Sequence, residues 1–139
     1  MLDTIKQRIE ESKSDHFQLL DLSDLDLDSF QESITDLKHV RRLNLSGNTL
    51  SSLPESIGKL TDLERLFLDG NPLESLPPGI GEMTNLRVIR CSDTKVAELP
   101  ESISHLDKLT ELDLAKGHLT KLPYGFGHLK SLKFLDLSD

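Results

Sequence analysis

The chain has 139 residues and a formal net charge of −8; hydrophobic residues make up 36% of it and aromatic residues only 4%. Its length fits a single domain, whose core must be aliphatic. The acidic balance argues against general affinity for nucleic acids or anionic membranes, because both favour a basic surface.

The sequence also predicts the compartment. No apolar run approaches the roughly 20 residues that cross a bilayer, and the N-terminus has no apolar segment typical of a signal peptide. The single cysteine, Cys91, cannot form an intramolecular disulfide and suits a reducing environment. We therefore expect a cytoplasmic protein that does not contact a membrane.

Residues 1–16 contain the first predicted element. The stretch "LDTIKQRIEESK" places Leu2, Ile5 and Ile9 on one side of a helix over residues 3–13, with Asp3 or Thr4 as its N-cap. We expect this amphipathic helix to cover the apolar end of the segment that follows, and the alternative is a helix that binds a partner.

Residues 17–139 repeat with a period of 23 residues, in units that start at residues 17, 40, 63, 86 and 109, with a partial unit at 132. Within a unit, L-x-x-L-x-L alternates like a strand with one buried face. The following L-P-x-x-I-x-x-L has the spacing of a short helical or 3₁₀ turn, with proline near its start. Two columns of core residues belong to the strands: Leu20, Leu43, Leu66, Ile89, Leu112 and Leu135, then Leu22, Leu45, Leu68, Cys91, Leu114 and Leu137.

Stacked units bury these leucines and form a parallel sheet with helical turns on its other side. Strands pack about 4.8 Å apart, more closely than helical turns. We therefore predict a curved α/β solenoid with the parallel β-sheet on its concave face, short turns on its convex face and an N-terminal capping helix.

The segment "RRLNLSGNTLSSLPESIGKL" at residues 41–60 carries a family resemblance. It resembles the leucine-rich repeat family, in the 23-residue intracellular class of Ras-suppressor-like, plant intracellular Ras-group-related and bacterial repeat proteins. The resemblance implies an asparagine after each strand that hydrogen-bonds to backbone groups of neighbouring turns. Asn48 and Asn71 match this pattern, whereas Leu25, Thr94 and Gly117 depart from it.

The sequence ends just after the sixth strand, at Asp139. The edge of that strand and the helical side of the fifth unit have no predicted cover, and an open edge favours pairing. Two interpretations stay open: the chain is a fragment of a longer array, or this end docks on another molecule, including a second copy in a homodimer.

A cluster of side chains on the concave face is the predicted binding surface. Arginines surround an exposed aromatic and a valine at its centre, with Asp21 on one side and two further carboxylates on the other, a composition typical of protein-binding hot spots. The alternative is a solvated face with an isolated phenylalanine. The predicted partner-binding residues are Arg42, Arg65, Phe67, Val88, Arg90, Glu111 and Asp113.

The sequence favours no catalysis. It contains no Ser–His–Asp pattern, phosphate-binding glycine loop or Cys–His metal spacing, and "DLSDLDLD" lacks the glycine and terminal glutamate of a calcium loop. We therefore predict no enzyme activity, cofactor or metal. The expected function is a protein–protein interaction module of the scaffold or effector-like kind. Alternatives are the recognition domain of a larger kinase, GTPase or ubiquitin ligase, or a self-associating structural repeat protein.

Overall fold

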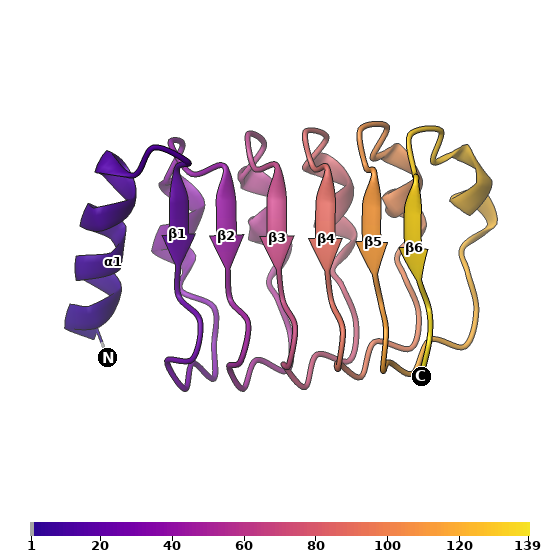
Figure 1. Cartoon of the computed structure of the whole chain (residues 1–139), viewed down its shortest axis with the longest axis horizontal. Coiled ribbons are helices and arrows are strands. Elements are labelled where there is room, and N and C mark those ends of the chain that lie inside the picture. The colour runs from indigo at the N-terminus through magenta and orange to yellow at the C-terminus, as the bar shows by residue number, and fades with distance from the viewer. Residues whose placement is uncertain (1) are drawn as a thin grey trace.

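A computed structural model describes residues 2–139. Six three-residue strands form one parallel sheet in sequence order, and each strand aligns with residues 23 positions further along the chain (Figure 1). The strands are β1 (Leu19–Asp21), β2 (Arg42–Asn44), β3 (Arg65–Phe67), β4 (Val88–Arg90), β5 (Glu111–Asp113) and β6 (Phe134–Asp136). The predicted parallel sheet is therefore confirmed.

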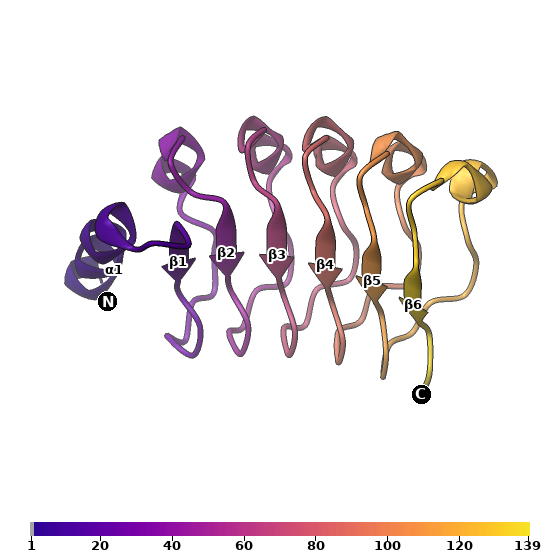
Figure 2. The ribbon, with the colours of Figure 1, turned by 45° about the horizontal axis from the view of Figure 1, so that its top comes forward.

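Five short 3₁₀ helices form the second layer, opposite the strands (Figure 2). They are η1 (Glu32–Asp36), η2 (Glu55–Lys59), η3 (Pro78–Glu82), η4 (Glu101–His105) and η5 (Tyr124–His128). A proline in extended conformation immediately precedes each of the last four. The fixed φ of proline is compatible with the extended conformation of the residue before each helix. Proline was expected in the first turn and instead lies one residue before it.

The layers enclose a core of leucine and isoleucine in which nearly every strand leucine of β1–β5 is fully buried. Asn48 connects neighbouring turns as the family resemblance implies. Its Oδ1 accepts hydrogen bonds from the backbone N–H groups of Leu25 and Leu27, both at 3.0 Å. Its amide donates to the carbonyls of Leu22 and Leu45 at 2.9 and 2.8 Å.

The asparagine pattern changes in the fourth unit. Asn71 repeats it with the carbonyls of Leu45 and Leu68. At the corresponding position of the next unit, the Thr94 hydroxyl donates only to the Cys91 carbonyl, at 3.0 Å. A hydroxyl replaces only part of an amide's bonding.

The N-terminal helix α1 (Leu2–Ser14) lies beside β1 (Figure 1). Ile5 is buried and Ile9 is half-buried against the core, whereas Leu2 is 58% exposed. The prediction that Leu2 joins the apolar contact was therefore wrong, because the first turn of α1 extends beyond the core. The N-cap prediction was also wrong: Asp3 and Thr4 lie inside the helix.

No helix within residues 2–139 is long and apolar enough to cross a membrane.

Candidate protein-binding surface on the concave face

The sheet brings the predicted site residues together because alternate strand residues point away from the core. The first outward row aligns Arg42, Arg65, Val88 and Glu111 in register. The second aligns Asn44, Phe67, Arg90 and Asp113. All seven predicted residues therefore lie on four adjacent strands, within about three strand spacings of 4.8 Å.

Three of these side chains form a connected series across β3, β4 and β5. The Arg90 guanidinium lies over the Phe67 ring, with its carbon 5.5 Å from the ring centroid. Its Nε donates to Glu111 Oε1 at 2.9 Å. The contact with the ring and the ion pair together place the Arg90 side chain between Phe67 and Glu111.

The second row also has a structural role that Phe67 and Arg90 do not perform. In four of the six units this position is aspartate or asparagine, and its side chain accepts the backbone N–H two residues later. These turns are Asp21–Ser23, Asn44–Ser46, Asp113–Ala115 and Asp136–Ser138. Phe67 and Arg90 cannot accept this bond. The two central units therefore lack this bond within the unit, a bond worth about 1 kcal/mol where no other acceptor replaces it.

Asp69 compensates in part for the missing turn at Arg90. Its Oδ1 accepts the Ser92 N–H at 2.7 Å and the Ser92 hydroxyl at 2.9 Å, from the neighbouring unit. Asp69 of the third unit thus stabilises the turn after β4 in the fourth unit. The side chains of Phe67 and Arg90 themselves have no turn-capping role.

Val88 contributes less surface than the sequence suggested, since it is only 5% exposed. Phe67, Arg65 and Asp113 are partly exposed, and Arg90 is exposed. Val88 therefore forms the floor between the arginines, and the accessible apolar area at the centre comes from Phe67.

Sequence reasoning missed Phe17. It occupies a repeat column that is buried at Val40, Leu63, Leu86 and Leu109, yet it is 58% exposed. The chain turns at Gln18, whose φ is +54°. The Phe17 ring then packs under the guanidinium of Arg42, 4.9 Å from its centroid, and edge-on to His16. The only available signal was an aromatic in a column of aliphatic residues.

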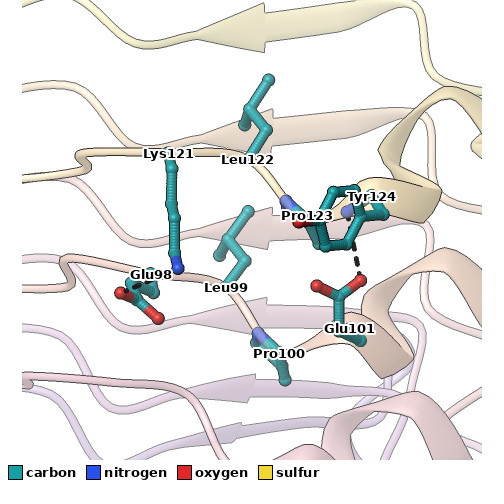
Figure 3. A pocket seen from close by; sticks show the side chains of 8 residues that line it. All are labelled: Glu98, Leu99, Pro100, Glu101, Lys121, Leu122, Pro123 and Tyr124. Carbon is teal, nitrogen blue, oxygen red and sulfur yellow. Dashed lines mark hydrogen bonds and ion pairs between the residues drawn. The ribbon is translucent and has the colours of Figure 1, made fainter.

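A separate groove lies near the C-terminal end, between the fourth and fifth units (Figure 3). It encloses about 380 Å³. Lys121 Nζ lies 3.4 Å from Glu98 Oε1, and Glu101 Oε2 accepts the Tyr124 backbone N–H at 3.1 Å. Its charged side chains are thus already paired within the protein. Within residues 2–139, no group of three or more His, Cys, Asp or Glu side chains is arranged to hold a metal ion.

The architecture is a parallel solenoid of short strands and 3₁₀ turns, linked by buried asparagines. A sequence model described as Leucine rich repeat matches residues 15–73. Residues 15–73 are thus leucine-rich repeats, and the same structural unit continues to residue 139.

Two solved structures are similar to this chain. A leucine-rich repeat protein of Leptospira interrogans is 31% identical with a TM-score of 0.72, over 96% of this chain and 39% of that chain. The plant peptide hormone receptor RGFR1, solved in complex with RGF2, is 37% identical with a TM-score of 0.76, over 84% of this chain and 20% of the receptor. The chain thus spans well under half the length of either protein. No curated protein matches it significantly in sequence.

Proposed function

We propose that this protein is a non-catalytic protein–protein interaction module that binds its partner through the concave face. The interface is centred on Arg65, Phe67, Val88 and Arg90 and bordered by Arg42, Glu111 and Asp113. The observation that carries the proposal is the exchange of turn-capping residues for Phe67 and Arg90 in the two central units. A loss of local bonding at adjacent positions is typical of residues retained for binding rather than stability.

Two further features support the proposal. The strands hold the side chains on a rigid sheet, so little conformational entropy is lost on binding. A receptor of similar fold has been solved in complex with RGF2, which supports protein binding as a use of this architecture. The predicted cytoplasmic setting, scaffold role and effector-like role remain part of this proposal.

The test is a capture experiment with the native protein as bait and a variant that carries Phe67→Ala and Arg65→Glu. We expect the variant to lose its specific partner while its thermal unfolding midpoint changes little, because both side chains point away from the core. The matched control carries Tyr124→Ala and Lys59→Glu, two exposed residues in η5 and η2. It makes the same change of charge and removes one aromatic ring. Equal capture by all three proteins would refute the proposed surface.

A second hypothesis concerns the context of the module. Both similar proteins are much longer than this chain, which supports a role as the recognition domain of a larger regulatory or enzymatic protein. The length of the natural reading frame tests this directly, and a frame that ends at residue 139 would contradict it.

Self-association is a third hypothesis, favoured by the apolar surface at β6. Leu135 and Leu137 are 38% and 43% exposed, although the equivalent residues of β1–β5 are buried. Pairing of two copies through this end would cover them. Light scattering tests the hypothesis, and a monomer whose mass is independent of concentration would contradict it.

A further inference from the structure

Some of the charged side chains along the concave face form ion pairs within the protein, and others do not. At one end, the Asp21 carboxylate lies 3.9 Å from Arg8 of α1. At the centre, Glu111 pairs with Arg90 at 2.9 Å. These pairs are internally balanced, so the charge available to a partner comes from the remaining residues.

The available positive charge lies on β2 and β3. Arg42 and Arg65 are register neighbours, and within residues 2–139 neither forms an ion pair with a carboxylate. Arg42 packs on the Phe17 ring, a contact that leaves its charge uncompensated. Asp69, which follows β3, accepts hydrogen bonds from Ser92 and within residues 2–139 forms no ion pair either, so two arginines face one carboxylate on these strands.

The available negative charge lies on β5 and β6. Asp113 and Asp136 are register neighbours, and across the described chain neither pairs with a basic side chain. Their carboxylates accept only the turn hydrogen bonds of Ala115 and Ser138. The hydroxyl and backbone hydrogen bonds from Ser138 lower the pKa of Asp136.

The face therefore has a basic half and an acidic half, separated by Phe67, Val88 and the Arg90–Glu111 pair. The midpoints of the two halves lie three strand steps apart, about 14 Å. An extended peptide that crosses the strands covers this distance in about four residues, at roughly 3.3 Å per residue.

We propose that the partner presents an extended segment with opposite charges at its two ends. Acidic residues contact Arg42 and Arg65, an apolar residue contacts Phe67, and basic residues contact Asp113 and Asp136. The inference rests on the proposed function of the concave face and adds the chemistry of its partner. The two oppositely charged halves of the face disfavour binding of a purely acidic or purely basic partner, because such a partner would place like charges together on one half.

The probes are four synthetic heptapeptides, labelled for fluorescence polarisation. The bipolar peptide has two glutamates, a phenylalanine flanked by glycines, and two lysines. The second peptide has the same composition with its charges intermixed, and the other two replace either the lysines or the glutamates by glutamine. We expect the bipolar peptide to bind at least about fivefold more tightly than the others at low salt, with the difference shrinking as salt rises.

Two charge-neutralising variants test the two halves. Arg42→Gln with Arg65→Gln should weaken the bipolar peptide roughly three- to twentyfold, the range expected for two exposed ion pairs. Asp113→Asn with Asp136→Asn should have the same effect and should leave the purely acidic peptide unchanged or tighter. Asparagine keeps the turn bond, as Asn44 does. The matched control, Asp36→Asn with Glu82→Gln, removes the same charge from the convex side and should change nothing.

The outcomes separate this inference from the proposed function. Equal binding of the bipolar and intermixed peptides, tighter binding of a singly charged peptide, or no binding of any peptide would overturn the inference. If the capture experiment still depends on Phe67 and Arg65 in those cases, the proposed function stands without it. If partner capture is also insensitive to these residues, both fail.

Discussion

Cys91 occupies a core column in which all the other units have leucine, and its thiol is completely buried. Burial raises the pKa of this thiol from 9.0 to about 12, and the carboxylates of Asp69 and Asp113 act in the same direction. Thr94, which contacts the sulfur at 3.6 Å, opposes the shift. Since the thiolate is the reactive form, we expect Cys91 to be unreactive in the folded protein.

The pH dependence of stability follows from this shift. Between pH 9 and 12 the unfolded thiol loses its proton while the folded thiol keeps it, so the folded state binds more protons. The free energy of unfolding should therefore fall by about 1.4 kcal/mol per pH unit once the unfolded thiol is ionised, and the contribution is fully present below pH 9. Urea titrations from pH 8 to 11 measure it.

Cys91→Ala is the control for this prediction, because it removes the thiol and leaves every other titratable group in place. Only the difference in slope between the two proteins belongs to the thiol. Identical slopes would show that Cys91 ionises as easily in the folded state as in the unfolded chain.

Neighbouring units are linked by hydrogen bonds from the side chain that follows each strand. Asn48 is almost completely buried and satisfies four backbone groups with one side chain. Thr94, at the equivalent position, satisfies one carbonyl and contacts the Cys91 sulfur. The stabilising effect of this position should therefore differ between units.

We expect Asn48→Ala to lower the free energy of unfolding by about 3 kcal/mol, because it leaves several buried polar groups unpaired. Thr94→Ala should lower it by only about 1 kcal/mol, since one hydrogen bond is lost. Chemical denaturation of both variants measures the contrast. Equal losses would mean that the asparagine ladder does not link the turns energetically.

Much of the order of strands and turns could be predicted because the same spacing of apolar residues recurs in each repeat unit. The strands and the 3₁₀ turns follow from the spacing of leucine and proline, and the role of Asn48 is what the family resemblance implies. Backbone turns with positive φ were less visible. Gly47 and Gly70 have φ near +70°, but Asp24, Asp93 and Lys116 have the same left-handed conformation without glycine.

The candidate site was predictable in its membership and less so in its contacts. Strand alternation alone places Arg65 and Phe67 on one face. The sequence does not reveal that Arg90 bridges Phe67 and Glu111, or that Phe17 supports Arg42. Those contacts depend on rotamers and on the turn at Gln18, which only packing determines. The exposure of Val88 was overestimated for the same reason.

At the scale of the whole molecule, the stability of each unit depends on the units beside it, since each one packs mainly on its neighbours. Helix α1 covers the first unit through Ile5, which is 3% exposed. The Ser12 hydroxyl adds a 2.9 Å hydrogen bond to His39. Loss of this cover should therefore weaken the N-terminal units more than the distant ones.

Ile5→Ala should lower the free energy of unfolding by about 2–4 kcal/mol through the cavity it leaves. Hydrogen exchange should show the largest loss of protection at the amides of β1 and β2 and the smallest at β5. Lys6→Ala, on the exposed side of α1, is the control and should leave the exchange pattern unchanged. A uniform loss along the sheet would instead indicate that all units unfold together.

The constant alignment of strands 23 residues apart has an evolutionary consequence. Duplication of one complete unit by recombination would continue the backbone ladder without a break, so the array tolerates changes in copy number. Duplication of the third unit would place a second copy of Phe67 beside the first and widen the centre of the concave face by one strand, about 5 Å. Gain or loss of a unit can thus retune partner choice in a single genetic step while the fold persists.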